Sequence, residues 1–366
     1  MPARKKPRRP TDAAIPSVGQ VLEKALLAEP DDLATHAAYA DWLTETGDPR
    51  GELIQVGIAL EDPGCSPTER KVLRAREVDL LRTYGMQWLG ALAEFVIDDA
   101  ALWQIRLARG WLDSLEIGRL TGEGAQALGK ALETRLLRRL IIEEMSGDLA
   151  RQVGLTPLIQ SPYLSNVRVL QLGETRREFP HRLEWITGAS IVDFVARLPR
   201  LEELSLYNPV EIERLAAVPT LTELRVLLHH TADENDRSAA VAALGRASHL
   251  KKLTHLHLRG TRHGPGFSEA IVASGLLGRL QMLDLGFSAT NDADAATLAA
   301  CPDVRRLELL DLTNTQVTQA GIDRLKKAGV TVRADHLTRR LTVTQYEVDA
   351  HARSDDDDLY DGEIEE

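Results

Sequence analysis

The chain has 366 residues and a formal net charge of −11; 43% of its residues are hydrophobic, only 4% are aromatic, and two are cysteines. Two cysteines are too few for a disulfide framework. No segment has the roughly 20 consecutive apolar residues of a membrane-spanning helix. The acidic body of the chain opposes the phosphate contacts that dominate nucleic-acid binding. We therefore expect a protein of the reducing cytoplasm that has an aliphatic core and binds neither membrane nor nucleic acid.

The first 16 residues are predicted to form a disordered basic tail. Five of the first ten residues are lysine or arginine, and no apolar segment follows them, which is not the pattern of a secretory signal. Apolar residues then recur at helical spacing in 17–29, 30–47 and 66–92. Residues 17–95 are therefore predicted to form a small all-α helical domain.

A short polar loop, GDPRG at residues 47–51, separates two of the predicted helices. Glycine readily ends a helix in left-handed backbone, and aspartate followed by proline is a typical helix start, with Pro49 as the first helical residue. The loop therefore predicts a corner between helices rather than a ligand-binding site. We expect Arg50 to pair with a carboxylate of the preceding helix, such as Asp41.

Residues 26–56 resemble the repeat-companion domain. The sequence elements EPDD, YADWL and GDPRGELI follow one another in the order typical of that family. The family is known mainly from planctomycetes and myxobacteria, where it commonly precedes leucine-rich repeats. Together with the residues around these elements, the resemblance covers about 60 of the 366 residues. It implies a bacterial protein of two parts, with no known enzymatic activity.

A phrase of the form L-x-x-L-x-L recurs eight times after residue 111, with other aliphatic residues in place of some leucines. Helical spacing occupies several intervals between phrases, so each repeat is predicted to be a strand followed by a helix. This pattern indicates an α/β fold over 96–336: a leucine-rich-repeat βα solenoid of about eight repeats, with parallel strands on its concave face. The central leucines of the phrases are Leu115, Leu140, Leu170, Leu204, Leu224, Leu256, Leu283 and Leu310.

Both ends of the repeat array have recognisable features. Two strand-like segments centred on Ile105 and Leu115 are too close for a parallel crossover, so a β-hairpin is predicted to cap the N-terminal end. Residues 329–335 are predicted to add a last short strand. Eight of the last twelve residues are acidic, and 337–366 are predicted to form an acidic, disordered tail.

Two groups of residues could carry chemistry, but a structural role is favoured for both. Cys301 and Asp303 match the C-x-D pattern of bacterial leucine-rich-repeat ubiquitin ligases, yet Cys301 ends a predicted repeat helix and is expected to be buried and inert. His255 and His257 lie two apart on a predicted strand and could share a metal ion, yet no further ligand follows at a recognised spacing. We expect no catalytic residue, no metal site and no cofactor.

The alternation of side chains along each strand predicts where a partner would bind. Residues between the inward-facing leucines point to the open face of the sheet, where tyrosine and arginine are frequent energetic anchors. The favoured function is a non-enzymatic protein–protein interaction module. Alternatives are a regulatory or structural subunit that is contacted through the helical domain, and an enzyme with an unrecognised thiol or metal site. The predicted partner-binding residues, all expected to be exposed, are Tyr207, Arg225, His255, His257, Arg259, Asp284 and Asp311.

Overall fold

A computed structural model describes most of the chain. The described residues are 17–97, 103–146, 154–173, 188–207, 212–230, 237–260 and 266–335. All of them belong to one compact unit, Met1–His336, which includes the predicted helical domain as well as the predicted solenoid. The two predicted tails, 1–16 and 337–366, lie outside the described residues. No helix in the described ranges is long and apolar enough to cross a membrane.

The N-terminal part of the chain is helical. Ser17 and Ser66 each begin a helix with a capping box, in which the serine side chain accepts a hydrogen bond from the backbone N–H of the third helical residue and the side chain of that residue bonds back. Asp32 accepts a hydrogen bond from a backbone N–H at the start of another helix. These helices are α1 (Val18–Ala28), α2 (Leu33–Glu45), α3 (Arg50–Glu61) and α4 (Pro67–Trp88), followed by η1 (Gly90–Leu92) and α5 (Ala93–Ile97).

The GDPRG corner forms between α2 and α3. Gly47 has a φ of +79°, the left-handed conformation in which glycine ends a helix without steric cost. The carboxylate of Asp48 accepts a hydrogen bond of 2.8 Å from the backbone N–H of Arg50. Helix α3 begins at Arg50 and not at Pro49, so the predicted corner is confirmed with a start one residue later.

The predicted pair between Arg50 and Asp41 is wrong. The carboxylate of Asp41 instead accepts a hydrogen bond of 3.0 Å from the side-chain amide of Gln55. The guanidinium carbon of Arg50 lies 6.0 Å from the ring centroids of both Trp88 and Trp111. Arg50 therefore faces aromatic rings of α4 and of the solenoid, where its planar cation interacts with their electron-rich faces.

The described part of the solenoid contains one sheet of ten strands, whose order in the sheet is their order in the chain. The first two strands are antiparallel, and every later neighbour pairs in parallel. Parallel pairing of consecutive strands requires a crossover, which the intervening helices provide. The strands are β1 (Trp103–Ala108), β2 (Trp111–Leu120), β3 (Arg139–Met145), β4 (Val169–Leu172), β5 (Glu203–Leu206), β6 (Val226–His230), β7 (His255–Arg259), β8 (Met282–Asp284), β9 (Leu309–Asp311) and β10 (Val332–Arg333).

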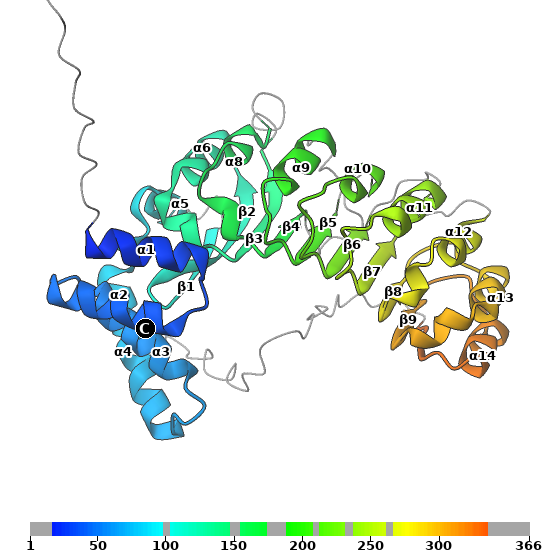
Figure 1. The fold of residues 1–366 in the computed structure, drawn as a ribbon, viewed down its shortest axis with the longest axis horizontal. Coiled ribbons are helices and arrows are strands. Elements are labelled where there is room, and N and C mark those ends of the chain that lie inside the picture. The colour runs from blue at the N-terminus through cyan, green and yellow to red at the C-terminus, as the bar shows by residue number, and fades with distance from the viewer. Residues whose placement is uncertain are drawn as a thin grey trace, which may run out of the picture. The chain divides into compact units, whose positions relative to one another are not determined.

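The crossover helices lie together on one face of this sheet, and the strands form the opposite side (Figure 1). The core lies between the two layers: each of the eight central leucines of the repeated phrase has at most 1% of its surface exposed. The predicted leucine-rich-repeat βα solenoid is therefore confirmed. Its helices are α6 (Gly122–Lys130), α8 (Thr156–Ile159), α9 (Gly188–Val195), α10 (Ile212–Ala216), α11 (Ser238–Arg246), α12 (Phe267–Ala273), α13 (Asp292–Ala300) and α14 (Gln319–Lys327), with η2 (Leu132–Leu136), η3 (Leu164–Asn166), η4 (Leu276–Gly278) and η5 (Pro302–Arg306) beside them.

One strand lies three residues later than predicted. In β6 it is Leu227, not Leu224, that pairs with Leu204 of β5 and Leu256 of β7. Leu224 is buried but precedes the strand. The sequence LTELRVLL offers apolar residues at both positions, so the phrase alone could not decide between them. As a result Leu228, and not Arg225, occupies the central row of the open face.

Both predicted ends of the array are present. Ile105 pairs with Leu115 in the antiparallel hairpin, and the turn residues Arg109 and Gly110 have φ values of +48° and +71°. Positive φ at both central residues is typical of the tight turn that matches the twist of a two-stranded hairpin. At the other end β10 pairs in parallel with β9.

Candidate interaction surfaces

The central row of the open face consists of residues that pair laterally from strand to strand. Its position in each strand lies between two buried side chains, as the alternation predicted. In β6 the second of these is His229, and in the other strands from β4 to β9 both are leucines. From β4 to β9 the row is Gln171, Ser205, Leu228, His257, Asp284 and Asp311.

The exposure expected for the later part of this row is wrong. Asp284 and Asp311 have 0% of their surface exposed, and His257 has 5%. One carboxylate oxygen of Asp284 accepts a hydrogen bond of 2.8 Å from the backbone N–H of Gly286. The other lies 3.0 Å from Nδ1 of His257 and 3.4 Å from Nε of Arg259. The short aspartate side chain thus turns back to the end of its own strand instead of pointing to solvent.

Asp311 repeats this arrangement one strand later. Its carboxylate accepts a hydrogen bond of 2.8 Å from the backbone N–H of Thr313, and it lies 3.4 Å from Nη1 of Arg333 on β10. Burial alone would raise the pKa of Asp284, but the hydrogen bond from His257 and the charge of Arg259 outweigh it and hold this pKa below its ordinary value of 3.8. The two aspartates therefore tie neighbouring strands together.

An aromatic cluster lies beside the buried aspartates, and we define it as Tyr207, His230 and Phe287. The rings of Tyr207 and His230 meet edge-on with centroids 5.9 Å apart, and His230 is 6.3 Å from Phe287. The guanidinium carbon of Arg259 is 4.8 Å from the centroid of Phe287. Burial raises the pKa of Tyr207 to about 12 and lowers the pKa of His230 to about 4, so both rings are neutral near pH 7.

The remaining predicted residues are more dispersed. Arg225 precedes β6 and forms an ion pair with Glu202, while His255 is half-buried and its Nδ1 lies 2.9 Å from the hydroxyl of Thr254. Burial lowers the pKa of His255. The structure thus places Tyr207 and Arg259 close together and leaves Arg225 outside that group. Among the described residues, no group of three His, Cys, Asp or Glu side chains could hold a metal ion.

Cys301 is only partly buried, so the complete burial expected of it is not found. It follows the last residue of α13, and its side chain packs against the aliphatic core of the solenoid. Its low reactivity stays a prediction.

The N-terminal helices share an aromatic core with the hairpin. The ring of Tyr39 stacks between Trp42 of its own helix and Trp111 of β2, with centroids 5.7 and 5.4 Å away. The guanidinium carbon of Arg135, from the segment after α6, lies 4.8 Å from the Trp111 centroid. These contacts make Trp111 part of the helical core as well as of the sheet.

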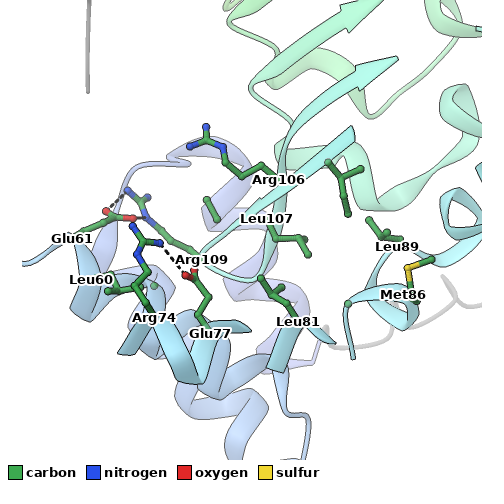
Figure 2. A pocket seen from close by; sticks show the side chains of 14 residues that line it. Leu60, Glu61, Arg74, Glu77, Leu81, Met86, Leu89, Arg106, Leu107 and Arg109 are labelled. Atoms are coloured by element: carbon green, nitrogen blue, oxygen red, sulfur yellow. Dashed lines mark hydrogen bonds and ion pairs between the residues drawn. The ribbon is translucent and has the colours of Figure 1, made fainter. Parts of the chain in front are cut away.

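The turn of the hairpin contacts α3 closely. A Cβ atom on Gly110 would lie 2.7 Å from Cγ1 of Ile54, and one on Gly57 would lie 3.1 Å from Cα of Arg109. The Arg109 side chain donates two hydrogen bonds of 2.6 Å to Glu61 at the end of α3. Beyond this turn, a groove of about 490 Å³ opens between α3, α4 and β1 (Figure 2).

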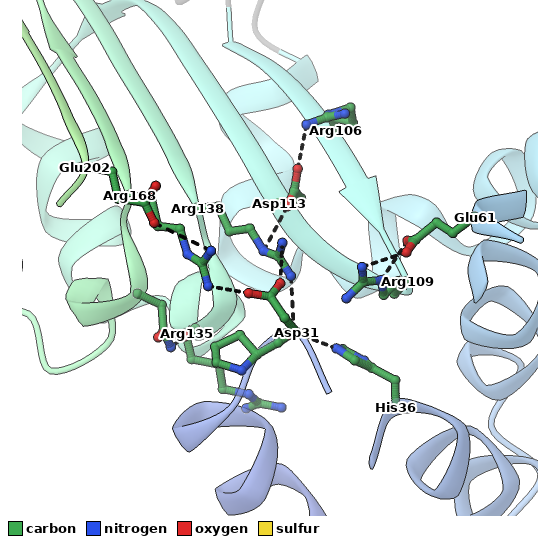
Figure 3. Close-up of polar contacts among 12 residues, drawn as sticks. Asp31, His36, Glu61, Arg106, Arg109, Asp113, Arg135, Arg138, Arg168 and Glu202 are labelled. Carbon is green, nitrogen blue, oxygen red and sulfur yellow. Dashed lines mark hydrogen bonds and ion pairs between the residues drawn. The ribbon is translucent and has the colours of Figure 1, made fainter. Parts of the chain in front are cut away.

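Ion pairs connect the loop before α2 to the first repeats (Figure 3). Asp31 lies between two arginines that precede β3 and β4, at 2.8 Å from Arg138 and 2.5 Å from Arg168. The carbonyl of Pro30 accepts a hydrogen bond of 3.1 Å from Arg138 and lies 2.9 Å from Nε2 of His36. Partial burial opposes ionisation of Asp31, but the hydrogen bond from Arg168 and both arginine charges lower its pKa. The EPDD and GDPRG elements thus both face the solenoid.

Comparisons with known proteins identify no relative by sequence and several solved structures of low similarity. No family model and no curated protein matches the chain. Similar solved structures include a Bacteroides fragilis protein (13% identity, 58% of this chain and 68% of that one, TM-score 0.43), a Listeria monocytogenes internalin (13%, 69% and 94%, TM-score 0.25) and a Leptospira interrogans leucine-rich-repeat protein (14%, 57% and 62%, TM-score 0.26). At these scores the fold assignment depends on this chain's own strand ladder and repeated phrase. It is a leucine-rich-repeat solenoid.

Sequence reasoning missed three residues of the solenoid's open face. Leu228 was hidden by the misplaced centre of β6. Phe287 follows β8 in a turn with a φ of +58°, where no strand alternation applies. His230 ends β6, and only its register with Arg259 of β7 reveals its position. Tyr207 and Arg259, which strand alternation had placed on the open face, were the sequence signals that pointed to this region.

Proposed function

We propose that this chain is a non-enzymatic cytoplasmic interaction module whose solenoid binds a protein partner on the open face of its sheet. The aromatic cluster is the observation that supports this proposal most. Its ring Phe287 is 37% exposed on the same face as the partly exposed Leu228. Large rings at the centre of a patch are common binding anchors, because they bury much area at little entropic cost.

The charges near this patch also favour partner binding. Arg259 is tied to Asp284, and Arg225 to Glu202. A partner that covers these arginines therefore does not isolate an unpaired charge, which would oppose binding. In this proposal Tyr207, Arg225, His255 and Arg259 contact the partner. His257, Asp284 and Asp311 hold the surface in place from below.

A second candidate function is a subunit role through the helical domain, which we propose to be a repeat-companion domain. The observation that favours it is the exposure of two apolar side chains of α4, Val72 at 65% and Val78 at 53%. A second protein that covers such side chains removes apolar surface from water, which favours binding.

Affinity purification from the native cells, followed by mass spectrometry, distinguishes the two functions. The baits are the full-length wild type, Leu228→Glu on the open face and Val78→Glu on α4. We expect one partner to be recovered with the wild type and with Val78→Glu, and to be lost with Leu228→Glu. Loss with Val78→Glu alone would instead support the subunit role, and a partner retained by both variants would contradict both proposals.

A further inference from the structure

The groove between β1 and α4 is a surface separate from the open face (Figure 2). Its walls come from the consecutive helices α3 and α4 and from the hairpin strand β1. Leu81 of α4 lies opposite Leu107 of β1, Met86 and Leu89 lie together at one end, and Arg74 and Glu77 lie towards the other end. The groove therefore has an apolar half and a charged half.

The backbone edge of β1 lines this groove. Five consecutive residues, Ile105–Arg109, belong to the lining. The first four of these residues belong to β1, whose ladder with β2 is irregular between Arg106 and Leu107, and Arg109 is in the turn. Successive side chains of a strand point mainly to opposite faces, so a lining that includes every residue of this stretch means that the backbone of β1 also borders the groove. In the strand order of the described sheet, β1 is the outermost strand and pairs with β2 alone. Its other edge presents backbone donors and acceptors to the groove, where an additional strand could pair with them.

Gly85 keeps the groove open on the helix side. It lies inside α4 and is itself buried, yet a Cβ atom built on it would meet no heavy atom within 4 Å. Glycine inside a helix is destabilising relative to alanine, and here close packing does not require it. The missing side chain leaves room beside the edge of β1.

The exposed charge around the groove is mainly positive. Arg74 is 58% exposed while its partner Glu77 is 16% exposed, and Arg106 is 69% exposed while its partner Asp113 is 12% exposed. In both ion pairs the guanidinium faces solvent and the carboxylate is recessed. Glu61 is the one exposed acid of the lining, so a ligand meets two accessible positive charges and one negative charge.

We propose that this groove binds an extended peptide segment of a partner protein, which adds to β1 as a further strand. Apolar side chains of the peptide pack against Leu81 and Leu107, and an acidic side chain pairs with Arg74 or Arg106. Main-chain hydrogen bonds supply affinity in this mode of recognition, and alternate side chains supply specificity. The site lies outside the surface of the proposed function and does not depend on it.

Selection of a random-peptide phage library on the full-length protein provides the probe. We expect enriched sequences to alternate apolar residues and to contain an acidic residue. One enriched peptide is then synthesised with a fluorescent label and titrated by fluorescence polarisation. Two further versions are N-methylated, one at the odd-numbered and one at the even-numbered residues. At least one of them should bind about tenfold more weakly, because strand addition requires the N–H groups of alternate residues.

Variants of the protein then locate the binding site. Gly85→Leu fills the groove and should weaken binding about tenfold or more, whereas Gly85→Ala should keep the fold and weaken binding less. Arg74→Glu should also weaken binding. Its matched control is Arg82→Glu, because Arg82 lies in the same helix, forms the same kind of ion pair with Asp79 and does not line the groove.

Circular dichroism melts verify that each variant is folded before binding is compared. The proposal is overturned if no peptide is enriched, if both N-methylated versions bind as tightly as the unmodified peptide, or if folded Gly85→Leu binds like the wild type. Leu228→Glu, on the open face, should bind the peptide normally. Loss of peptide binding in that variant alone would assign the peptide to the open face and also contradict the groove.

Discussion

At the scale of single residues, the buried carboxylate of Asp284 is expected to stabilise the repeats around it. Asp284→Ala should lower the free energy of unfolding by about 3–5 kcal/mol, because it leaves His257 and Arg259 without their buried partner. Urea denaturation at pH 7 measures this loss. The control is Asp303→Ala, whose ion pair with Arg306 is exposed and should contribute less than about 1 kcal/mol. Equal losses in the two variants would contradict a structural role for Asp284.

The same carboxylate makes stability depend on pH. The pKa of Asp284 in the folded chain lies below 3.8, so the folded state favours its ionised form more than the unfolded state does. Its contribution is therefore complete above the unfolded value and is lost as the pH falls through the lower folded value. The difference in unfolding free energy between the wild type and Asp284→Asn should be constant from about pH 5 to 7 and shrink below about pH 4. Urea titrations at each pH test this, and a difference that grows on acidification would contradict it.

Gly47 and Gly110 both have left-handed backbone, and substitution by alanine at these positions distinguishes the cost of backbone strain from the cost of a steric clash. Gly47 has a φ of +79°, and a Cβ atom placed there would meet no heavy atom within 4 Å, so Gly47→Ala should cost only the backbone strain of about 1–2 kcal/mol. Gly110 has a φ of +71°, and a Cβ there would also lie 2.7 Å from Ile54. Gly110→Ala should therefore cost about 1–3 kcal/mol more. Chemical denaturation measures the loss of unfolding free energy in both variants. A larger loss in Gly47→Ala than in Gly110→Ala would contradict the prediction.

At the scale of elements, the sequence determined the strands and helices better than it determined their contacts. The phrase leucines located β2–β5 and β7–β9, because a strand with one buried face must alternate. The repeated phrase did not locate β6 correctly, because LTELRVLL satisfies the pattern in two registers. The exposure of Asp284 and Asp311 was mispredicted for a different reason. Alternation gives the face of a side chain, but it does not reveal that a short carboxylate turns back to its own backbone.

The junction between helices and solenoid could not be predicted at all. Asp31 and Arg168 form one of its ion pairs although 137 residues separate them in the sequence. The groove beside β1 likewise requires α4 and the hairpin to meet, and no local pattern encodes that meeting. The sequence did mark the participants. Asp31 of EPDD and Arg50 of GDPRG belong to the two polar elements that the sequence singled out, and they contact the first repeats and the hairpin.

This junction predicts that the helices and the first repeats lose structure together. Trp111→Ala removes a ring that packs on Tyr39 and Arg135 and should cost about 3–5 kcal/mol. Hydrogen exchange should show faster exchange in α1–α3 and in β1–β3, with β7–β9 unchanged. Faster exchange confined to the sheet would mean that the helical domain is stable without its contact to the hairpin.

At the scale of the whole molecule, a solenoid should unfold from whichever end is weakened, because each repeat contacts mainly its neighbours. Four of the five tryptophans, Trp42, Trp88, Trp103 and Trp111, lie in the helices and the hairpin. Tryptophan fluorescence therefore reports mainly on the N-terminal end, while far-ultraviolet circular dichroism reports on helices along the whole chain. Two variants with similar expected losses at opposite ends can be compared in this way.

In Asp284→Ala, circular dichroism should change at lower urea concentration than tryptophan fluorescence, because the weakened repeats lie far from the tryptophans. In Trp111→Ala the order should reverse, and the three remaining N-terminal tryptophans still report the transition. The separation arises because a local loss of about 3–5 kcal/mol is comparable with the 5–15 kcal/mol that holds a typical domain together. The wild type, with both ends intact, serves as the control for coincident transitions. If both probes coincided in all three proteins, the chain would unfold as one cooperative unit, and the nearest-neighbour description of this solenoid would have to be abandoned.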